Sequence, residues 1–237
     1  MFAFSLDTGE NPDIITYIDD VKNLESNKTN LGYRKVRLLH VHQKEKLTDA
    51  LEKAAGVYGN QGFIHLLDKN NSIITSTFIS NVRVIKSVKS NLILTGEIWF
   101  NPKGFHKAGK MFINNEIREK NTWKKLNNDE LQGLLLFALC TAKPQQDREN
   151  PIISIDGHHF HNLDGFYCTL GEEINGTGGY FGRQLYALYD CLRGDFGVKS
   201  ISEITWYHHQ RSKKLLKTNF NKITDLFREF GISRILK

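Results

Sequence analysis

The first 140 residues alternate between strand-like and helix-like spacing of apolar side chains. Apolar residues alternate with basic residues and histidines from Arg34 to His42, which predicts a half-buried strand, whereas Lys46–Ala55 has helical spacing. Two hairpins are predicted, one from the strands Phe63–Leu67 and Ile73–Ile79 and one from the strands Val82–Val88 and Asn91–Phe100. A further strand is predicted at Met111–Glu119, and a helix from Asn128 through Ala142. This mixture predicts an α+β domain.

A polar segment separates this region from a second pattern. Thr141–Pro151 is polar and contains Pro144 and Pro151, which is typical of a linker. We therefore predict two domains, 1–145 and 146–237, with the boundary near residue 146. The elements predicted after it are strands at Ile152–Ile155, Ile201–Tyr207 and Ile232–Leu236, and helices at Leu163–Ile174, Arg183–Arg193, Lys213–Phe220 and Lys222–Phe230. This β-α-α-β-α-α-β order favours an α/β fold with a small parallel sheet covered by helices.

Composition narrows the class of protein. The chain has 237 residues, of which 40% are hydrophobic and 24% charged, enough apolar side chains for a real core. Its longest apolar run, Leu134–Cys140, is too short to span a membrane. The N-terminus lacks a basic region before its first acidic residues, so we expect no signal peptide and a cytoplasmic protein. The 3 cysteines, Cys140, Cys168 and Cys191, lack disulfide or zinc spacing, and we expect buried thiols.

The net charge of +6 is scattered along the chain, so we expect no direct binding of nucleic acid. The densest basic stretch, Arg211–Lys217, carries Leu215 and Leu216 on one side and is interpreted as a solvated helix face. The glycine-rich segment Asn175–Gly182 lacks the spacing and the lysine of a phosphate-binding loop. We interpret it as a turn that displays the aromatic pair Tyr180–Phe181.

Histidines form two groups. His158, His159 and His161 resemble a metal-binding patch that His208 and His209 could approach, but no carboxylate or thiol completes it in the sequence, so surface histidines are favoured and we expect no metal. His40 and His42 share a strand face. A structural role is favoured for them because no nucleophile accompanies them; the alternative is a pocket that they line with His65. Trp99 and Trp123 are expected in the core.

The C-terminal third resembles the barstar-type ribonuclease-inhibitor family. Tyr180–Gly194, which reads YFGRQLYALYDCLRG, is similar to the family's most recognisable stretch. Ile155-Asp156-Gly157 resembles its opening strand and turn, Ile204-Thr205-Trp206 its second strand, and Leu226–Glu229 its last helix. The resemblance covers residues 151–237, in the right order, and none of residues 1–145. It implies a barstar-like three-stranded parallel sheet with helices, and a protein that plugs the active site of a ribonuclease.

The resemblance also implies contact residues. Asp190 matches the family's central aspartate, which faces the nuclease; the alternative is a solvated helix carboxylate. Leu185, Leu188 and Leu192 fall on one helix face and should be buried, leaving Asp190 and Tyr186 outside that face. Tyr186 stands where the family usually has an aspartate. It removes a charge and adds an amphipathic surface, unless it has no binding role.

The predicted contact set is Tyr180, Gly182, Arg183, Tyr186, Asp190, Asp195 and Glu229. Tyr180 is expected to contact the nuclease and Phe181 to pack in the core. Asp195 replaces a family aromatic, and the hypothesis is that it restores the charge lost at Tyr186. Glu229 matches the family's glutamate at the edge of the binding surface, although an exposed salt bridge is the alternative.

These observations predict a stoichiometric inhibitor of a ribonuclease, an immunity protein or antitoxin rather than an enzyme, with no cofactor. Residues 146–237 carry 12 Lys and Arg against 11 Asp and Glu, a net of +1, which gives weak steering toward a basic nuclease. A local acidic patch at Glu172, Glu173, Asp190 and Asp195 would compensate. Two alternatives stay open: residues 1–145 are an enzyme or ligand sensor that the barstar-like domain docks to a partner, or they are a second immunity module.

Overall fold

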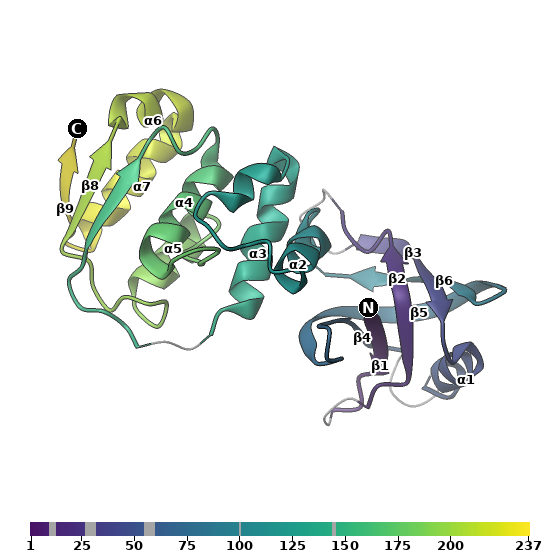
Figure 1. Ribbon diagram of the computed structural model, residues 1–237. Coiled ribbons are helices and arrows are strands. Elements are labelled where there is room, and N and C mark those ends of the chain that lie inside the picture. Colours follow the sequence, from purple (N-terminus) through teal and green to yellow (C-terminus); the bar gives the residue numbers. More distant parts are fainter. Residues whose placement is uncertain (10–12, 27–31, 55–59, 100, 144–145) are drawn as a thin grey trace. The chain divides into compact units, whose positions relative to one another are not determined.

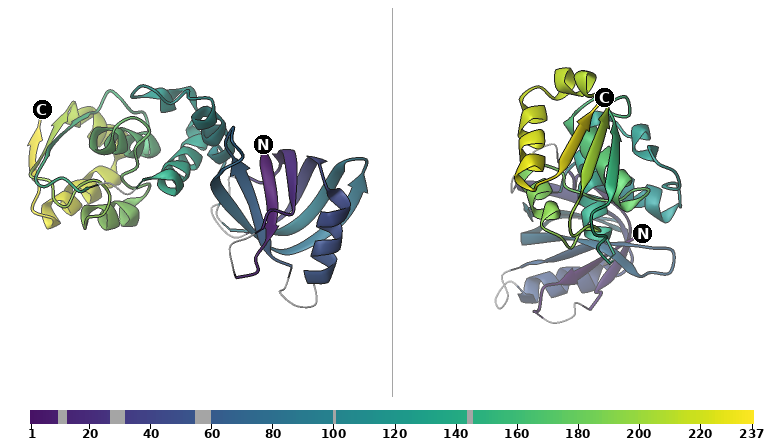
Figure 2. Two further views of the ribbon diagram at one scale, coloured as in Figure 1. Left: turned by 60° about the horizontal axis from the view of Figure 1, so that its bottom comes forward. Right: turned by 90° about the vertical axis from the view of Figure 1, so that its left-hand side faces the viewer.

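The chain forms two units of different architecture, Met1–Gly109 and Lys110–Lys237. The computed structural model in Figures 1 and 2 describes residues 1–9, 13–26, 32–54, 60–99, 101–143 and 146–237. Six strands form the N-terminal unit, and a three-stranded sheet with helices forms the C-terminal unit. The predicted fold class, an α+β region followed by a parallel α/β sheet, is confirmed.

The N-terminal unit is a closed antiparallel barrel in which β1 pairs with both β2 and β4, in the strand order β1-β2-β3-β6-β5-β4. Apolar side chains such as Ile18, Val36, Leu38, Ile64 and Leu94 are buried and fill it, as expected for a barrel of this size. Its elements are β1 (Phe2–Leu6), β2 (Thr16–Lys22), β3 (Gly32–Val41), α1 (Lys44–Ala54), β4 (Gly62–Leu67), β5 (Ile73–Val88) and β6 (Asn91–Ile98).

The runs Ile73–Ile79 and Val82–Val88, predicted as separate strands, are parts of the single strand β5. Its pairing with β6 shifts register between Ser80 and Arg83, and Asn81 has a left-handed φ of 52°. Such a bulge bends a strand without ending it, so the polar residues between the two runs marked a bend and not a turn.

The histidines of the barrel do not share a pocket. His65 is buried, and its ring nitrogens bond to the hydroxyls of Ser5 at 2.8 Å and Ser76 at 2.7 Å. Burial lowers the pKa of His65, which keeps the ring neutral between these two partners. His40 and His42 instead approach Asp19, at 3.6 and 2.8 Å. The structural role predicted for these histidines agrees with this arrangement.

The C-terminal unit is built on the parallel sheet β7-β8-β9, with one face against helices. Ile153, Ile155, Ile204 and Trp206 are buried beneath those helices, and the right-hand view of Figure 2 shows the sheet in front of them. Right-handed crossovers between adjacent strands place the connecting helices on one side. The elements are β7 (Ile152–Asp156), α4 (Leu163–Asn175), α5 (Leu185–Leu192), β8 (Glu203–Tyr207), α6 (His209–Leu216), α7 (Thr218–Glu229) and β9 (Ser233–Leu236).

A second layer of helices covers the outer side of α4. The short 3-10 turns η1 (Thr122–Lys125) and η2 (Asn128–Glu130) lead into α3 (Leu131–Thr141), which packs against α4. Trp123 is buried, and its ring would touch a Cβ placed on Gly165 of α4. On its other side Phe166 of α4 stacks on Trp206 of the sheet, at 5.3 Å between ring centroids. Helix α4 is therefore buried on both sides.

The compact units divide between Gly109 and Lys110, whereas the sequence predicts a boundary near residue 146. The difference arises because α3 packs with α4, so that residues 110–143 join the C-terminal unit. The polar segment 141–151 connects two parts of one unit; its Pro144 and Gln145 lie outside the described residues.

Three predictions about single elements and residues are wrong. Met111–Glu119 is not a strand: Met111–Ile113 is the last turn of α2 (Phe105–Ile113), because a short apolar run fits a buried helix end as well as a strand. Trp99 is 62% exposed after the end of β6. Cys140 is exposed, while Cys168 and Cys191 are buried as expected.

Among the residues that the structure describes, no helix combines the length and the apolar character that crossing a membrane requires.

Candidate functional site

One face of α5 presents an acid and two aromatic rings to solvent. Tyr186 is 80% exposed, Tyr189 is 37% exposed, and Asp190 is exposed one turn after Tyr186. The opposite face is buried through Leu188 and Leu192, as the leucine spacing predicts, whereas Leu185 is only half-buried. Exposed rings of this size on a rigid helix are typical of protein-binding surfaces.

The end of α7 lies beside this face. Phe230, which follows α7, packs edge-to-face on Tyr189 with ring centroids 5.3 Å apart. Glu229, the last residue of α7, is exposed next to this contact. The Arg193 guanidinium lies 6.0 Å from the centre of the Tyr189 ring. Asp190 and Glu229 thus belong to one surface of mixed charge, which we call the α5 face: Tyr186, Tyr189, Asp190, Arg193 and Glu229.

The loop before α5, residues 176–184, is held in place by hydrogen bonds from the Asn175 side chain. The Asn175 amide donates to the Tyr180 carbonyl at 2.7 Å and to the Phe196 carbonyl at 3.0 Å. Tyr180 is only 5% exposed and its ring lies 5.9 Å from that of Phe196. Tyr180 therefore lies beneath the surface, which does not agree with the predicted contact role. Phe181 is fully buried, as expected.

Two residues at the start of α5 have structural partners. Gly182 is buried with φ of 90°, a conformation that favours glycine, and a Cβ there would lie 3.0 Å from the Leu188 nitrogen. Arg183 is half-buried, and its guanidinium reaches the Gln132 side chain of α3 at 3.4 Å. Gln132 also donates to Asp164 at 2.7 Å and to the Arg183 carbonyl at 3.1 Å. These contacts connect α3 to the entrance of α5.

The predicted acidic patch is not assembled. Glu172 is buried and Glu173 forms an ion pair with Lys120 at 2.8 Å, so neither carboxylate is presented to a binding partner. Asp195 is exposed with a left-handed φ of 68°, and its backbone N–H donates to Asp147 at 2.6 Å. Of the four acids, Asp190 and Asp195 remain exposed.

Glu172 is the important residue that sequence reasoning assigned to the wrong role. One of its oxygens accepts from the Asn121 N–H at 2.7 Å and the Trp123 Nε1–H at 3.2 Å, and the other accepts from the Gly178 N–H at 3.2 Å. A single carboxylate thus joins the η1 turn, α4 and the glycine-rich loop that leads to α5. A glutamate among the apolar residues of α4 was the available signal, because acids are rarely buried without partners.

A cavity of about 650 Å³ opens beside this loop, within the C-terminal unit. Its apolar lining comes from Phe112, Ile117, Phe137, Tyr180 and Phe196. The Tyr180 ring therefore forms part of a cavity wall and not of the α5 face.

The buried thiols are poor nucleophiles. Burial, together with the nearby Asp190 charge, raises the pKa of Cys191 to about 12, and burial raises the pKa of Cys168 as well. The reactive form of cysteine is the thiolate, so neither group suits catalysis near neutral pH.

The family comparison matches the part of the chain that carries the α5 face. Residues 150–233 match the model of the barstar family, described as barnase inhibitor. The C-terminal domain is barstar-like. The matched segment contains α4, α5, α7 and all contact residues predicted above, and it excludes α3 and the barrel. No curated protein matches the chain.

Proposed function

We propose that the C-terminal unit binds and inhibits a ribonuclease, with the α5 face as the contact surface. The observation that carries this proposal is the exposure of Asp190 and Tyr186 on a helix that lies within the barstar-like segment. The chain would act by stoichiometric binding and not by catalysis, as an immunity protein or antitoxin.

The chemistry of the target supports this role for Asp190. A ribonuclease site is rich in basic groups because it holds phosphate, and a carboxylate can occupy the place of a phosphate through charge-assisted hydrogen bonds. Buried Leu188 and Leu192 hold α5 in place, so Asp190 is presented on a rigid element. Preorganisation of this kind reduces the entropy lost on binding.

Tyr186 and Arg193 give the α5 face its own selectivity. Tyr186 is largely exposed and offers apolar area with one hydroxyl. Arg193, whose guanidinium lies beside the Tyr189 ring, adds a positive charge to the same face. We propose that the target has a basic centre for Asp190 and a less basic, partly apolar rim for Tyr186.

The test is capture of a nuclease from an extract of the native cell. Full-length wild type, Asp190→Ala and Asp190→Asn are immobilised side by side, and the RNase activity of the eluate is measured before and after adding free wild type. Glu149→Ala is the matched control, since Glu149 is an exposed acid paired with Lys199 before β7. Wild type and the control should capture a nuclease and silence it.

Both Asp190 variants should lose affinity by about 2–5 kcal/mol, roughly 30-fold to several thousand-fold, because one partner of a desolvated charge pair is removed. Capture of the same nuclease by Asp190→Ala at wild-type affinity contradicts the role of Asp190. Capture of one non-nuclease partner by every variant contradicts inhibition and favours a docking module.

A further inference from the structure

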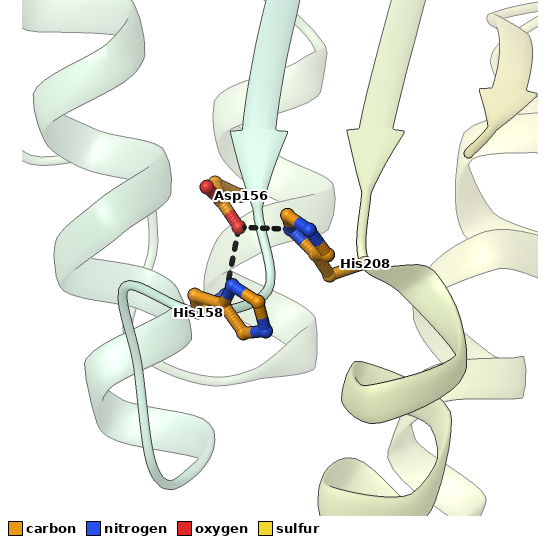
Figure 3. Close-up of side chains that lie close together, drawn as sticks. All are labelled: Asp156, His158 and His208. Atoms are coloured by element: carbon orange, nitrogen blue, oxygen red, sulfur yellow. Dashed lines mark hydrogen bonds and ion pairs between the residues drawn. The ribbon is translucent and has the colours of Figure 1, made fainter.

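A second cluster of side chains lies at the carboxyl ends of β7 and β8, on elements that the α5 face does not use. Asp156 ends β7, His158 follows it in a turn, and His208 follows β8 (Figure 3). The strands are parallel with Asp156 opposite Tyr207, so their ends meet at one edge of the sheet. One ligand atom from each side chain lies within 4.8 Å of the others.

The histidine rings are held as a pair beside one carboxylate. The rings of His158 and His208 stack with centroids 3.8 Å apart and planes inclined by 22°. His208 Nδ1 lies 2.7 Å from an Asp156 oxygen, and the His158 backbone N–H donates to the same oxygen at 2.8 Å. The three side chains thus present a carboxylate oxygen and two imidazole rings at one place on the edge of the sheet.

The backbone around the cluster is tightly determined. His208 has φ of 52° and ψ of 37°, a left-handed conformation that is uncommon outside glycine and concentrates at functional sites. A Cβ on Gly157 would lie 2.3 Å from the Ser212 hydroxyl and 2.7 Å from the His208 carbonyl. The turn between Asp156 and His158 is therefore pressed against the start of α6. It holds His158 over His208.

Of the neighbouring groups, His159 Nε2 lies 3.9 Å from the second Asp156 oxygen, whereas Arg211, His161 and His209 have other partners. Arg211 donates to the carbonyls of Gly157 and Phe160, and it also contacts His161 Nδ1 at 2.9 Å. These bonds keep His161 out of the cluster, although sequence spacing placed it beside His158. His209 Nδ1 lies 2.9 Å from the Lys237 carbonyl oxygen. Among the described residues, no side-chain hydrogen bond to the imidazole of His158 is present.

We propose that Asp156, His158 and His208 bind a divalent transition-metal ion of the zinc class. Two imidazoles and one carboxylate are a common set of three protein ligands for zinc, with water in the fourth position. Imidazole nitrogen favours zinc, copper and nickel over magnesium and calcium, which prefer oxygen. At metal–ligand distances of about 2.0–2.2 Å, the ligand atoms must lie roughly 3.3 Å apart. Small rotations of these partly exposed side chains give that spacing.

The metal would tie the turn after β7 to the junction of β8 and α6. Binding would therefore stabilise the folded unit in proportion to zinc concentration, since a ligand that prefers the folded state raises stability. The site is independent of the α5 face: it shares no residue with it, and its failure would leave the proposed inhibition unchanged.

The experiment is calorimetric titration of the full-length chain with zinc chloride, with thermal unfolding at each zinc concentration. The variants are Asp156→Asn, His158→Gln and His208→Gln. The controls are His42→Gln, which removes the His–Asp contact of the barrel, and Cys140→Ser, which removes the exposed thiol. Wild type and both controls should bind one zinc ion per chain and unfold at a higher temperature when it is present.

Each cluster variant should weaken binding at least tenfold and lose the zinc-dependent rise in unfolding temperature. His158→Gln alters a ring with no side-chain hydrogen bond in the described structure, so circular dichroism should show it folded even if His208→Gln is not. Wild-type affinity in His158→Gln overturns the proposal. So do the absence of zinc binding in wild type, and a loss of binding that appears in His42→Gln or Cys140→Ser instead.

Discussion

Two segments of the C-terminal unit pack together but differ in their relation to known proteins. Residues 150–233 match the barstar family, whereas residues 110–143 lie outside the match. Yet residues 110–143 bury the outer side of α4, donate from Asn121 to Glu172 of that helix, and donate from Gln132 to the Arg183 carbonyl before α5. The difference teaches that the extent of a family match and the extent of a folding unit are separate quantities.

The largest effect is expected from separating these segments. The fragment 110–237 should fold, whereas 146–237 should not unfold cooperatively. The shorter fragment exposes the outer side of α4 and loses the burial of Trp123, Leu131 and Leu135. At about 1.5–3 kcal/mol for each large apolar side chain, this loss is comparable with the whole stability of a domain. Urea denaturation followed by circular dichroism measures both fragments. A cooperative transition of equal midpoint in 146–237 would show that the preceding helices contribute nothing.

The next largest contrast is in the reactivity of the three thiols. Cys140 of α3 is exposed, whereas Cys168 and Cys191 are buried with raised pKa values. Iodoacetamide at pH 8 should modify the native chain once, at Cys140, at least about 100-fold faster than the other two, which react through unfolding. Mass spectrometry of digested protein gives the three rates, with urea-unfolded chain as the control. Comparable rates for Cys168 and Cys140 would mean that α4 is open to solvent.

Glu172→Ala should destabilise the full-length chain by about 2–4 kcal/mol, because it leaves three N–H groups without their acceptor. Glu173→Ala is the matched control on the same helix: its ion pair with Lys120 is partly exposed, and its loss should cost below about 1 kcal/mol. Denaturant midpoints of the two variants check this order. Equal losses would indicate that the Glu172 contacts do not hold the loop to the η1 turn.

A smaller effect concerns Asp164, which bonds α4 to Gln132 of α3. Burial raises the pKa of Asp164, although the hydrogen bond from Gln132 opposes this shift. A carboxyl whose pKa is higher folded than unfolded binds protons more tightly when folded. Stability is therefore lost as the pH rises from the unfolded value, about 3.9, through the raised folded value. Asp164→Asn keeps the oxygen acceptor and removes this titration.

The stability of Asp164→Asn relative to wild type should thus increase as the pH rises above about 3.9 and level off once the folded carboxyl has ionised. Urea denaturation at a series of pH values measures the difference. A relative stability that falls over the same range would mean that the charged form of Asp164 is favoured in the folded protein.

The comparison of segments also explains what the sequence could and could not predict. The β-α-α-β-α-α-β order and the exposure of Asp190 followed from periodicity, because the buried stripe of α5 is formed by local spacing. The burial of Tyr180 and Glu172 did not follow: Glu172 accepts a hydrogen bond from Asn121, 51 positions earlier, and Tyr180 packs on Phe196 and lines a cavity together with Phe137. The Asp156–His208 pair likewise depends on strand register, which joins residues 52 positions apart. Packing between residues far apart in the chain determines these features, and the local spacing of residues in one sequence does not reveal that packing.

The smallest expected effect is on target affinity when the barrel is removed. Fragment 110–237 contains the α5 face and the helices that fix its loop, so it should inhibit the captured nuclease with the same affinity as the full chain, within about threefold. Inhibition titrations with the two proteins provide the measurement, and Asp190→Ala in both lengths is the control.

A fragment that binds much more weakly would favour the alternative in which residues 1–109 contact the target as a second immunity module. A fragment that captures the nuclease but no longer silences it would instead give the barrel a part in blocking the active site. Only equal inhibition leaves the barrel free for a separate activity; its buried His65, bonded to Ser5 and Ser76, is held by structural partners.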